Sequence, residues 1–240
     1  MSNITRRQLF RQGLGGLAAG GMAALTLRAD AGLTEATEDV HDYQASLVAE
    51  KGQPRIQPAE KFEPTHPDIL GPYHLKGAPF RGKVTPPMEP GELLVMRGRV
   101  WGFDTKKPLA NALLDVWQAD AKGNYDLTDP RNPPKRQKFR NRIRLVTDET
   151  GAYEYETIRP GSYRIGAGPR GFRPAHIHYM VQARGYKKLI TQLYFAGDKH
   201  IKTDRWASKS NLIIKPEKVK TANGSYDLGT FDIVLDHNRA

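Results

Sequence analysis

Residues 141–166 read NRIRLVTDETGAYEYETIRPGSYRIG, and this stretch decides the fold. Three β-prone runs, at 141–146, 152–157 and 162–166, alternate with the turn signals Asp-Glu-Thr-Gly and Arg-Pro-Gly. Similar β-prone runs separated by turn signals occur on both sides, with further strands expected near 93–101, 111–117, 175–183, 189–195 and 226–235. About eight short strands at this spacing predict an all-β fold, an antiparallel β-sandwich.

The first residues predict an export signal. Thr5-Arg6-Arg7-Gln8-Leu9-Phe10 is a twin-arginine pattern, followed by a Gly/Ala-rich run at 13–27 and an A-x-A-like cleavage site at 29–31. The run is shorter than the roughly 20 apolar residues of a membrane span. The expected organisation is a signal peptide at 1–31, an irregular, partly helical extension at 32–70 and the β-sandwich at 71–240. We therefore expect a periplasmic or secreted protein that meets the twin-arginine translocase during export and has no stable membrane association.

Composition limits the chemistry. The 240 residues include no cysteine, so thiolate metal sites and disulfides are excluded, and a metal would need His, Tyr, Asp or Glu. The net charge is +11, of which residues 1–31 contribute +3. Six basic residues lie within 135–144, in the sequence KRQKFRNRIR, but no nucleic-acid-binding motif accompanies them, and a solvated loop running into a strand is expected there. A functional alternative is attraction of anionic aromatic substrates by the positive field.

The sequence Arg173-Pro174-Ala175-His176-Ile177-His178 predicts a metal pair. Side chains alternate along a strand, so His176 and His178 share one face. Neutral imidazoles suit iron, copper or zinc. Tyr125 and Tyr163 each closely follow a glycine, as expected of ligands at turns or strand ends. Because a phenol has a pKa near 10, it binds as a phenolate only to a strongly Lewis-acidic cation, which favours ferric iron over copper or zinc.

An ordered set of motifs resembles a known family. The motifs are G-x-V at 98–100, NALLDVWQAD at 111–120, GNYD at 123–126, TIRPGSY at 157–163, RPAHIH at 173–178 and LITQLYFAGD at 189–198. Together they resemble the intradiol ring-cleavage dioxygenases, which include catechol 1,2-dioxygenase, hydroxyquinol 1,2-dioxygenase and protocatechuate 3,4-dioxygenase. One departure is Lys106-Lys107, where the family often has glycine in a turn.

The resemblance implies one non-haem Fe(III) per chain, held by Tyr125, Tyr163, His176 and His178. It implies an oxidoreductase that opens a catechol ring between its two hydroxylated carbons, inserting both atoms of dioxygen to give a cis,cis-muconate-type diacid. Tyr163 would also act in catalysis as the phenolate that substrate displaces. Arg173 would stabilise negative charge on the bound substrate. The implied partners are a catechol and dioxygen, and a homo-oligomer is compatible with the family.

Four further residues are candidate substrate contacts. Gln192 matches a family glutamine near the pocket, and Tyr73 is expected at the pocket mouth. Arg164 and Arg170 could bind a carboxylated ring, with surface solvation as the alternative for both. Trp117 and Asp115 are expected to be structural, and His74 is expected to take no part in the chemistry. The competing function is an exported, non-catalytic β-sandwich binding module that has lost its metal.

Overall fold

The computed structural model describes residues 62–127, 129, 131–135, 138–166, 168, 171–221 and 224–237. The predicted signal peptide and residues 32–61 of the extension lie outside the described residues, as does Arg170. Residues 62–70, the described part of the extension, form neither helix nor strand. Within the described part of the chain, no helix is long and apolar enough to cross a membrane.

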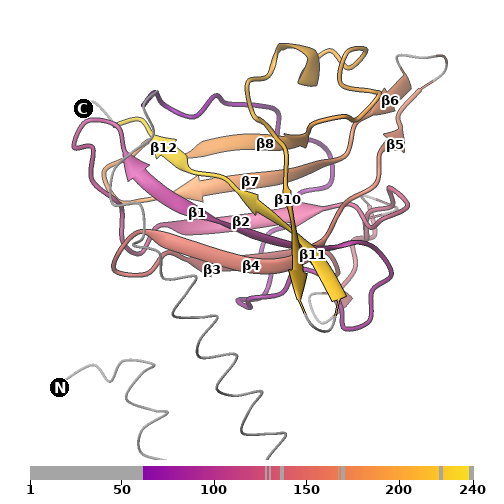
Figure 1. Ribbon diagram of the computed structural model, residues 1–240, viewed down its shortest axis with the longest axis horizontal. Coiled ribbons are helices and arrows are strands. Elements are labelled where there is room, and N and C mark those ends of the chain that lie inside the picture. Colours follow the sequence, from indigo (N-terminus) through magenta and orange to yellow (C-terminus); the bar gives the residue numbers. More distant parts are fainter. Residues whose placement is uncertain are drawn as a thin grey trace, which may run out of the picture. The chain divides into compact units, whose positions relative to one another are not determined.

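The first of two five-stranded sheets is built around β1 (Figure 1). Strand β1 runs antiparallel to β4 along one edge. Along its other edge it pairs in parallel first with β11 and then with β12, and β10 extends the sheet beyond β11. The bounds are β1 Leu93–Gly102, β4 Ala152–Ile158, β10 Glu217–Thr221, β11 Gly224–Thr230 and β12 Ile233–Leu235.

The second sheet has the order β3-β2-β7-β8-β9. All its pairs are antiparallel except that between β8 and β9. A separate two-stranded hairpin joins β5 to β6, and one short 3₁₀ helix, η3, follows β8. The bounds are β2 Leu113–Gln118, β3 Arg142–Val146, β5 Tyr163–Arg164, β6 Phe172–Arg173, β7 His176–Gln182, β8 Leu189–Phe195, η3 Ala207–Lys209 and β9 Ile213–Ile214.

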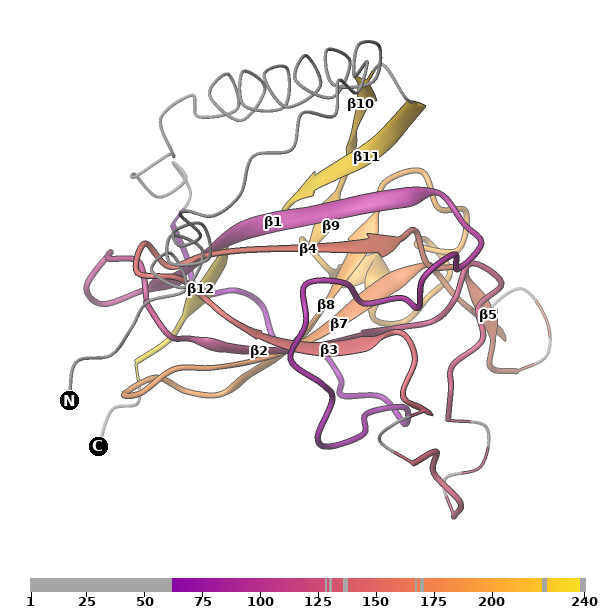
Figure 2. The same ribbon diagram turned by 90° about the horizontal axis from the view of Figure 1, so that it is seen from below.

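The hydrophobic core lies between the two sheets, which Figure 2 shows as stacked layers. Alternate residues of each strand enter it, because side chains of a strand point to opposite faces. Strand β7 contributes Ile177, Tyr179 and Val181, all fully buried. His176 and His178 therefore point to the opposite face of the second sheet, away from the apolar core.

The predicted all-β sandwich is confirmed, with corrections to its pairing and bounds. The sheets are not purely antiparallel, because β1–β11, β1–β12 and β8–β9 pair in parallel. The strand expected at 162–166 is two residues long, and the one expected at 226–235 is divided at 231–232. At that break the backbone N–H of Arg99 donates a hydrogen bond to Asp232 Oδ1 at 2.9 Å, so a side-chain carboxylate takes the place of a strand carbonyl. Strands β6, β9 and β10 were not predicted.

Candidate metal centre

The two histidines predicted as ligands lie in the middle of the second sheet. On β7, His178 is opposite Trp117 of β2 on one side and Gln192 of β8 on the other. His176 is opposite Tyr194 of β8. Both imidazoles are buried. The Trp117 ring stacks on His178, with centroids 4.7 Å apart and planes 5° from parallel, so the neighbouring strand fixes the plane of this imidazole.

The Nε2 atoms of His176 and His178 converge to 3.1 Å. In His176 the other ring nitrogen, Nδ1, lies 2.7 Å from the Pro174 carbonyl oxygen, to which it donates. Because a neutral imidazole carries one hydrogen, this bond leaves the Nε2 lone pair of His176 free to bind a cation. His178 Nδ1 is buried without a hydrogen-bond partner among the described residues, so Nε2 is the nitrogen that it directs into the cluster.

A close approach of two turns brings the predicted tyrosines together. The turn before Tyr125 has Gly123 at φ 85°, and a Cβ there would lie 2.4 Å from the Ser162 carbonyl oxygen. Gly161 N–H donates to the Asp120 carbonyl at 2.8 Å, closing the same contact from the other side. Glycine tolerates both the left-handed φ and the missing space. The turn that carries Tyr125 is thereby packed on the segment that leads into Tyr163.

The two phenols complete the cluster with the histidines. The rings of Tyr125 and Tyr163 meet edge to face with centroids 5.5 Å apart. The Tyr125 hydroxyl oxygen lies 3.5 Å from His176 Nε2, and the Tyr163 ring centroid lies 5.7 Å from that of His176. The structure therefore brings all four predicted ligand residues together.

Burial keeps all four groups neutral in the absence of a cation. Burial, followed by the charge of Arg173, lowers the pKa of His176 to about 3, and burial together with His176 lowers the pKa of His178 well below its usual value. Burial raises the pKa of Tyr163 to about 12 and that of Tyr125 well above 10. The imidazoles thus offer lone pairs at neutral pH, whereas the phenols need a strong Lewis acid to ionise.

The donor set fits ferric iron. Among the described residues, no group of three or more His, Asp or Glu side chains could hold a metal ion. Among the described residues, Tyr125 and Tyr163 are the predicted oxygen donors that lie beside the two imidazoles. Two imidazoles and two phenolates form a nitrogen and oxygen set with two negative charges, which suits a trivalent cation.

Arg173, which strand periodicity alone could not place, faces the cluster. It pairs with Tyr163 across the β5–β6 hairpin and is almost fully buried. Its Nε lies 2.7 Å from an Asp204 carboxylate oxygen, and its Nη2 donates to Gln192 Oε1 at 2.8 Å and to the Tyr194 hydroxyl at 3.0 Å. Its positive charge favours the ionised form of both ligand phenols.

Gln192 and Tyr73, two of the predicted substrate contacts, both lie at the cluster. Fully buried Gln192 is opposite His178, accepts from Arg173 and donates its Nε2–H to the Ile69 carbonyl at 2.6 Å. The Tyr73 ring stacks on Tyr125, with centroids 4.0 Å apart and planes 10° from parallel. Gln192 is thus held by protein partners at both ends, and Tyr73 covers one face of a ligand ring.

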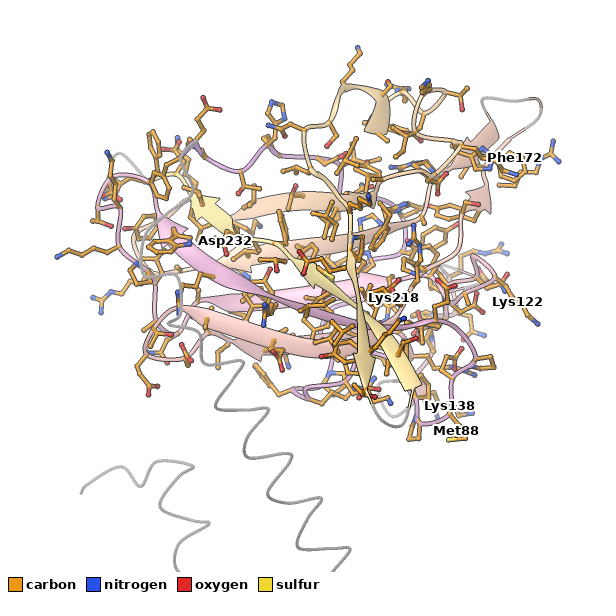
Figure 3. The ribbon with its side chains drawn as sticks, viewed as in Figure 1. Met88, Lys122, Lys138, Phe172, Lys218 and Asp232 are labelled. Atoms are coloured by element: carbon orange, nitrogen blue, oxygen red, sulfur yellow. The ribbon has the colours of Figure 1, made fainter. Side chains whose placement is uncertain are left out.

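Arg164, a third predicted substrate contact, lies at the edge of the site. It is exposed, and its Nε donates to the Gly166 carbonyl at 2.9 Å. Its guanidinium carbon lies 5.2 Å from the centroid of the ring of Phe172, which Figure 3 labels at the edge of the sandwich. These contacts agree with the alternative that Arg164 is a solvated surface residue. The prediction for Arg170 falls outside the described residues.

Sequence reasoning missed several neighbours of the cluster. Trp117 supports His178 directly, and His74 contacts the Trp117 ring edge-on, with centroids 4.8 Å apart. His74 Nε2 also lies 3.4 Å from an Asp115 carboxylate oxygen. The motif containing Asp115 and Trp117 was recognised, but no periodicity in the sequence connects it to a histidine forty residues upstream.

The described surface also has a groove away from the His176, His178, Tyr125 and Tyr163 cluster. An open groove is lined by Arg81, Phe139, Arg140, Lys138 and residues 86–90, and Figure 3 shows Met88 and Lys138 near each other at one end of the sandwich. It contains none of the predicted ligands.

The comparisons with known proteins identify the family. A family model described as Dioxygenase matches residues 69–237. The chain belongs to the intradiol ring-cleavage dioxygenase family. A chlorocatechol 1,2-dioxygenase from Rhodococcus opacus is 38% identical over 189 residues, which is 71% of this chain and 72% of that protein. A catechol 1,2-dioxygenase from Acinetobacter lwoffii is 37% identical over 172 residues, covering 65% of this chain and 61% of that protein.

A solved structure agrees with these relatives. The dioxygenase domain of a dioxygenase and carbohydrate-binding protein fusion from Streptomyces sp. SirexAA-E superposes with a TM-score of 0.57 at 35% identity. The match covers 73% of this chain and all of that domain. The predicted resemblance is confirmed, and with it the enzyme class, an oxidoreductase of the intradiol dioxygenase type.

Proposed function

We propose that this intradiol dioxygenase holds one non-haem Fe(III) through Tyr125, Tyr163, His176 and His178 and opens the ring of a catechol between its hydroxylated carbons. Both atoms of dioxygen would enter a cis,cis-muconate-type diacid. The observation that carries the proposal is the convergence of the two imidazole Nε2 atoms, the buried Tyr125 phenol and the partly exposed Tyr163 phenol in one cluster. No external reductant is required, because the four electrons that reduce dioxygen come from oxidation of the catechol ring.

The histidines supply lone pairs without a proton being removed first. With the pKa of His176 at about 3 and that of His178 well below its usual value, both are neutral across the physiological range. When bound, ferric iron would supply Lewis acidity that withdraws electron density from a chelated catechol.

Tyr163 is the better placed of the two phenols to exchange a proton with substrate. It is partly exposed and lies on a two-residue strand, whereas Tyr125 is buried beneath Tyr73. Its pKa of about 12 as a free phenol makes its phenolate oxygen a strong acceptor for a catechol hydroxyl proton. We propose that Tyr163 takes this proton while Tyr125 keeps its place.

Arg173 would stabilise the negative charge that develops on the substrate. Asp204, Gln192, Tyr194 and the Trp206 ring, 4.6 Å from its guanidinium carbon, fix its orientation before substrate arrives. A charge fixed in advance in a buried site stabilises a transition state without reorganising during the reaction. Gln192 and Tyr73 would form walls of the substrate pocket.

We also propose that the protein works in the periplasm or outside the cell. The support is the sequence Thr5 to Phe10 and the apolar run after it, read as a twin-arginine signal. Fusing residues 1–35 to a reporter that is active only after folded export tests this. Export that depends on Arg6 and Arg7, and on the twin-arginine translocase, supports the proposal, and retention of the reporter in the cytoplasm contradicts it.

Oxygen isotope labelling tests the reaction most directly. Iron-loaded protein is supplied with ¹⁸O₂ and a panel comprising catechol, a chlorocatechol, hydroxyquinol and protocatechuate. We expect one dioxygen consumed per ring opened and one ¹⁸O in each new carboxylate. Binding of a catechol without oxygen uptake by the iron-loaded protein would favour the alternative of a binding module. A yellow semialdehyde product would show cleavage outside the diol.

A further inference from the structure

Arg142 is a fully buried cation that neither the predicted ligand set nor the proposed chemistry uses. It opens strand β3 and is 1% exposed. In the sheet register it lies opposite Trp117, and Trp117 lies opposite His178 on β7. Because directly opposite residues of antiparallel strands point to the same face, Arg142 faces the metal-ligand side of the sheet, one strand beyond Trp117.

The guanidinium of Arg142 connects two segments that are far apart in sequence. Its Nε donates to Asp126 Oδ2 at 3.0 Å, its Nη2 donates to Asp126 Oδ1, and its Nη1 donates to the Tyr73 carbonyl oxygen at 3.0 Å. The Asp126 side chain is 5% exposed, so both partners of the ion pair are shielded from water. A planar fork of this kind sets orientation as well as distance.

Both segments carry aromatic rings of the candidate metal centre. Asp126 directly follows Tyr125, and the Tyr73 ring stacks on the Tyr125 ring at 4.0 Å. Arg142 therefore holds the backbone beside Tyr125 and the backbone of the residue that covers Tyr125. In contrast, Tyr163 stands on the short β5–β6 hairpin, and among the described residues its neighbour Arg164 makes no comparable bidentate ion pair.

We propose that Arg142 is a positioning residue that clamps Tyr125 beneath Tyr73, so that Tyr125 remains the fixed phenol of the metal centre while Tyr163 is free to exchange. This inference rests on the proposed iron site. It assigns to the Arg142–Asp126 pair a role beyond that of an ordinary buried ion pair, which would stabilise the fold without affecting the ligand set.

Replacement of Arg142 by lysine tests the clamp, because lysine keeps the charge but lacks the fork. Arg144→Lys is the matched control. Arg144 lies two residues along the same strand and on the same face, and its Nε donates to the Ala78 carbonyl at 2.6 Å, away from the tyrosines. Asp126→Asn provides a second variant that keeps the side-chain shape.

Three measurements separate positioning from stability. We expect Arg142→Lys to release iron to a chelator about 10- to 100-fold faster than Arg144→Lys, as is typical when a residue supporting a metal ligand is changed. We expect its visible tyrosinate band to shift while that of Arg144→Lys does not. In iron-free protein carrying 3-fluorotyrosine at position 125, the ¹⁹F signal should move or broaden in Arg142→Lys and Asp126→Asn only.

The ¹⁹F measurement keeps the inference distinct from the proposed function. If wild-type protein binds no Fe(III), the proposed function fails, whereas the iron-free signal still reports whether the clamp holds Tyr125. If Arg142→Lys does not fold, Asp126→Asn is compared with Arg144→Lys in its place. Iron release, band position and ¹⁹F signal equal to those of Arg144→Lys would overturn the inference and leave a purely structural ion pair.

Discussion

At the scale of single residues, the sequence allowed the four candidate ligands to be named, but not the residues that support them. His176 and His178 are two residues apart on one strand, so alternation alone places them together. Tyr125 and Tyr163 were connected to them only by the order of motifs, because their approach depends on a turn-to-turn contact at Gly123 and Gly161. No local pattern reveals such a contact.

The burial of charged residues was the feature hardest to predict from the sequence. The basic run that contains Arg142 was interpreted as a solvated loop entering a strand, yet Arg142 is buried. A buried arginine in a β-strand has the same sequence signature as an exposed one, and only its buried partner Asp126, sixteen residues away, distinguishes them. Strand alternation could not assign a face to Arg173 either, since Pro174 disturbs the alternation between Arg173 and His176.

Replacement of Arg173 by glutamine should impair turnover without removing the metal. We expect kcat/KM to fall by about 100-fold or more, since a fixed charge near the developing negative charge is lost, while iron content stays near one per chain. Steady-state kinetics with metal analysis measures both. Arg205→Gln is the control, because exposed Arg205 contacts the same Trp206 ring, 4.6 Å from its guanidinium carbon. Equal kinetics for the two variants would remove Arg173 from the catalytic account.

At the scale of elements, strands with clear alternation and turn signals were predicted well. The expected strands at 93–101, 141–146, 175–183 and 189–195 agree with β1, β3, β7 and β8 within a residue or two. Strands β9 and β6 are two residues long, too short for a period to be visible, and their existence depends on neighbouring strands. The parallel pairings of β1 follow from long connections that sequence patterns do not specify.

The turn between β3 and β4 should make stability depend on pH through Asp148. Its Oδ1 accepts from the N–H groups of Thr150 at 2.8 Å and Ala152 at 2.9 Å and from the Thr150 hydroxyl at 2.8 Å. Burial disfavours ionisation of Asp148, but these hydrogen bonds outweigh it and lower the pKa below 3.8. A carboxylate with a lowered pKa stabilises the fold above its unfolded-state pKa and loses that effect as pH falls.

We therefore expect Asp148→Ala to cost about 1 kcal/mol of unfolding free energy at pH 7, typical of lost hydrogen bonds. The difference from wild type should shrink as pH falls below about 4, where the unfolded carboxyl gains its proton. Urea unfolding at pH 7, 5 and 3 measures this, with Glu149→Gln in the same turn as a control. A difference that is constant across these pH values would contradict the role of the ionised carboxylate.

At the scale of the whole molecule, the sandwich holds its metal-ligand face under covering segments rather than in the apolar core. The second sheet buries Ile177, Tyr179 and Val181 on one side and presents His176 and His178 on the other. Segments before β1 and after β2 and β8 supply Tyr73, Tyr125 and Asp204 to that side. The candidate site thus assembles only in the complete fold, so binding of the proposed iron would depend on folding.

Removal of iron should lower thermal stability. A ligand that binds only the folded state stabilises it by about 2.7 kcal/mol at a free concentration 100 times its Kd. For a chain of this length that corresponds to roughly 5–10 °C in Tm. Calorimetry of iron-loaded protein before and after chelation measures the change. A Tm that is the same with and without iron would contradict tight binding of the metal by the folded protein.

The central claim is that two tyrosinates and two histidines bind ferric iron that a catechol can reach. The most direct test is the visible spectrum of iron-loaded protein under nitrogen, before and after addition of the catechol panel, for wild type, Tyr163→Phe and the control Tyr155→Phe. Tyr155, on β4 of the first sheet, is buried in the core between the sheets. Its hydroxyl shares a hydrogen bond with that of Tyr179, which lies on the core face of β7, opposite to the face of His176 and His178. We predict a red-brown tyrosinate-to-iron band that moves to longer wavelength with substrate, is altered by Tyr163→Phe and is unchanged in Tyr155→Phe. A colourless protein with negligible iron after ferric loading, or a band indifferent to Tyr163, would contradict the account.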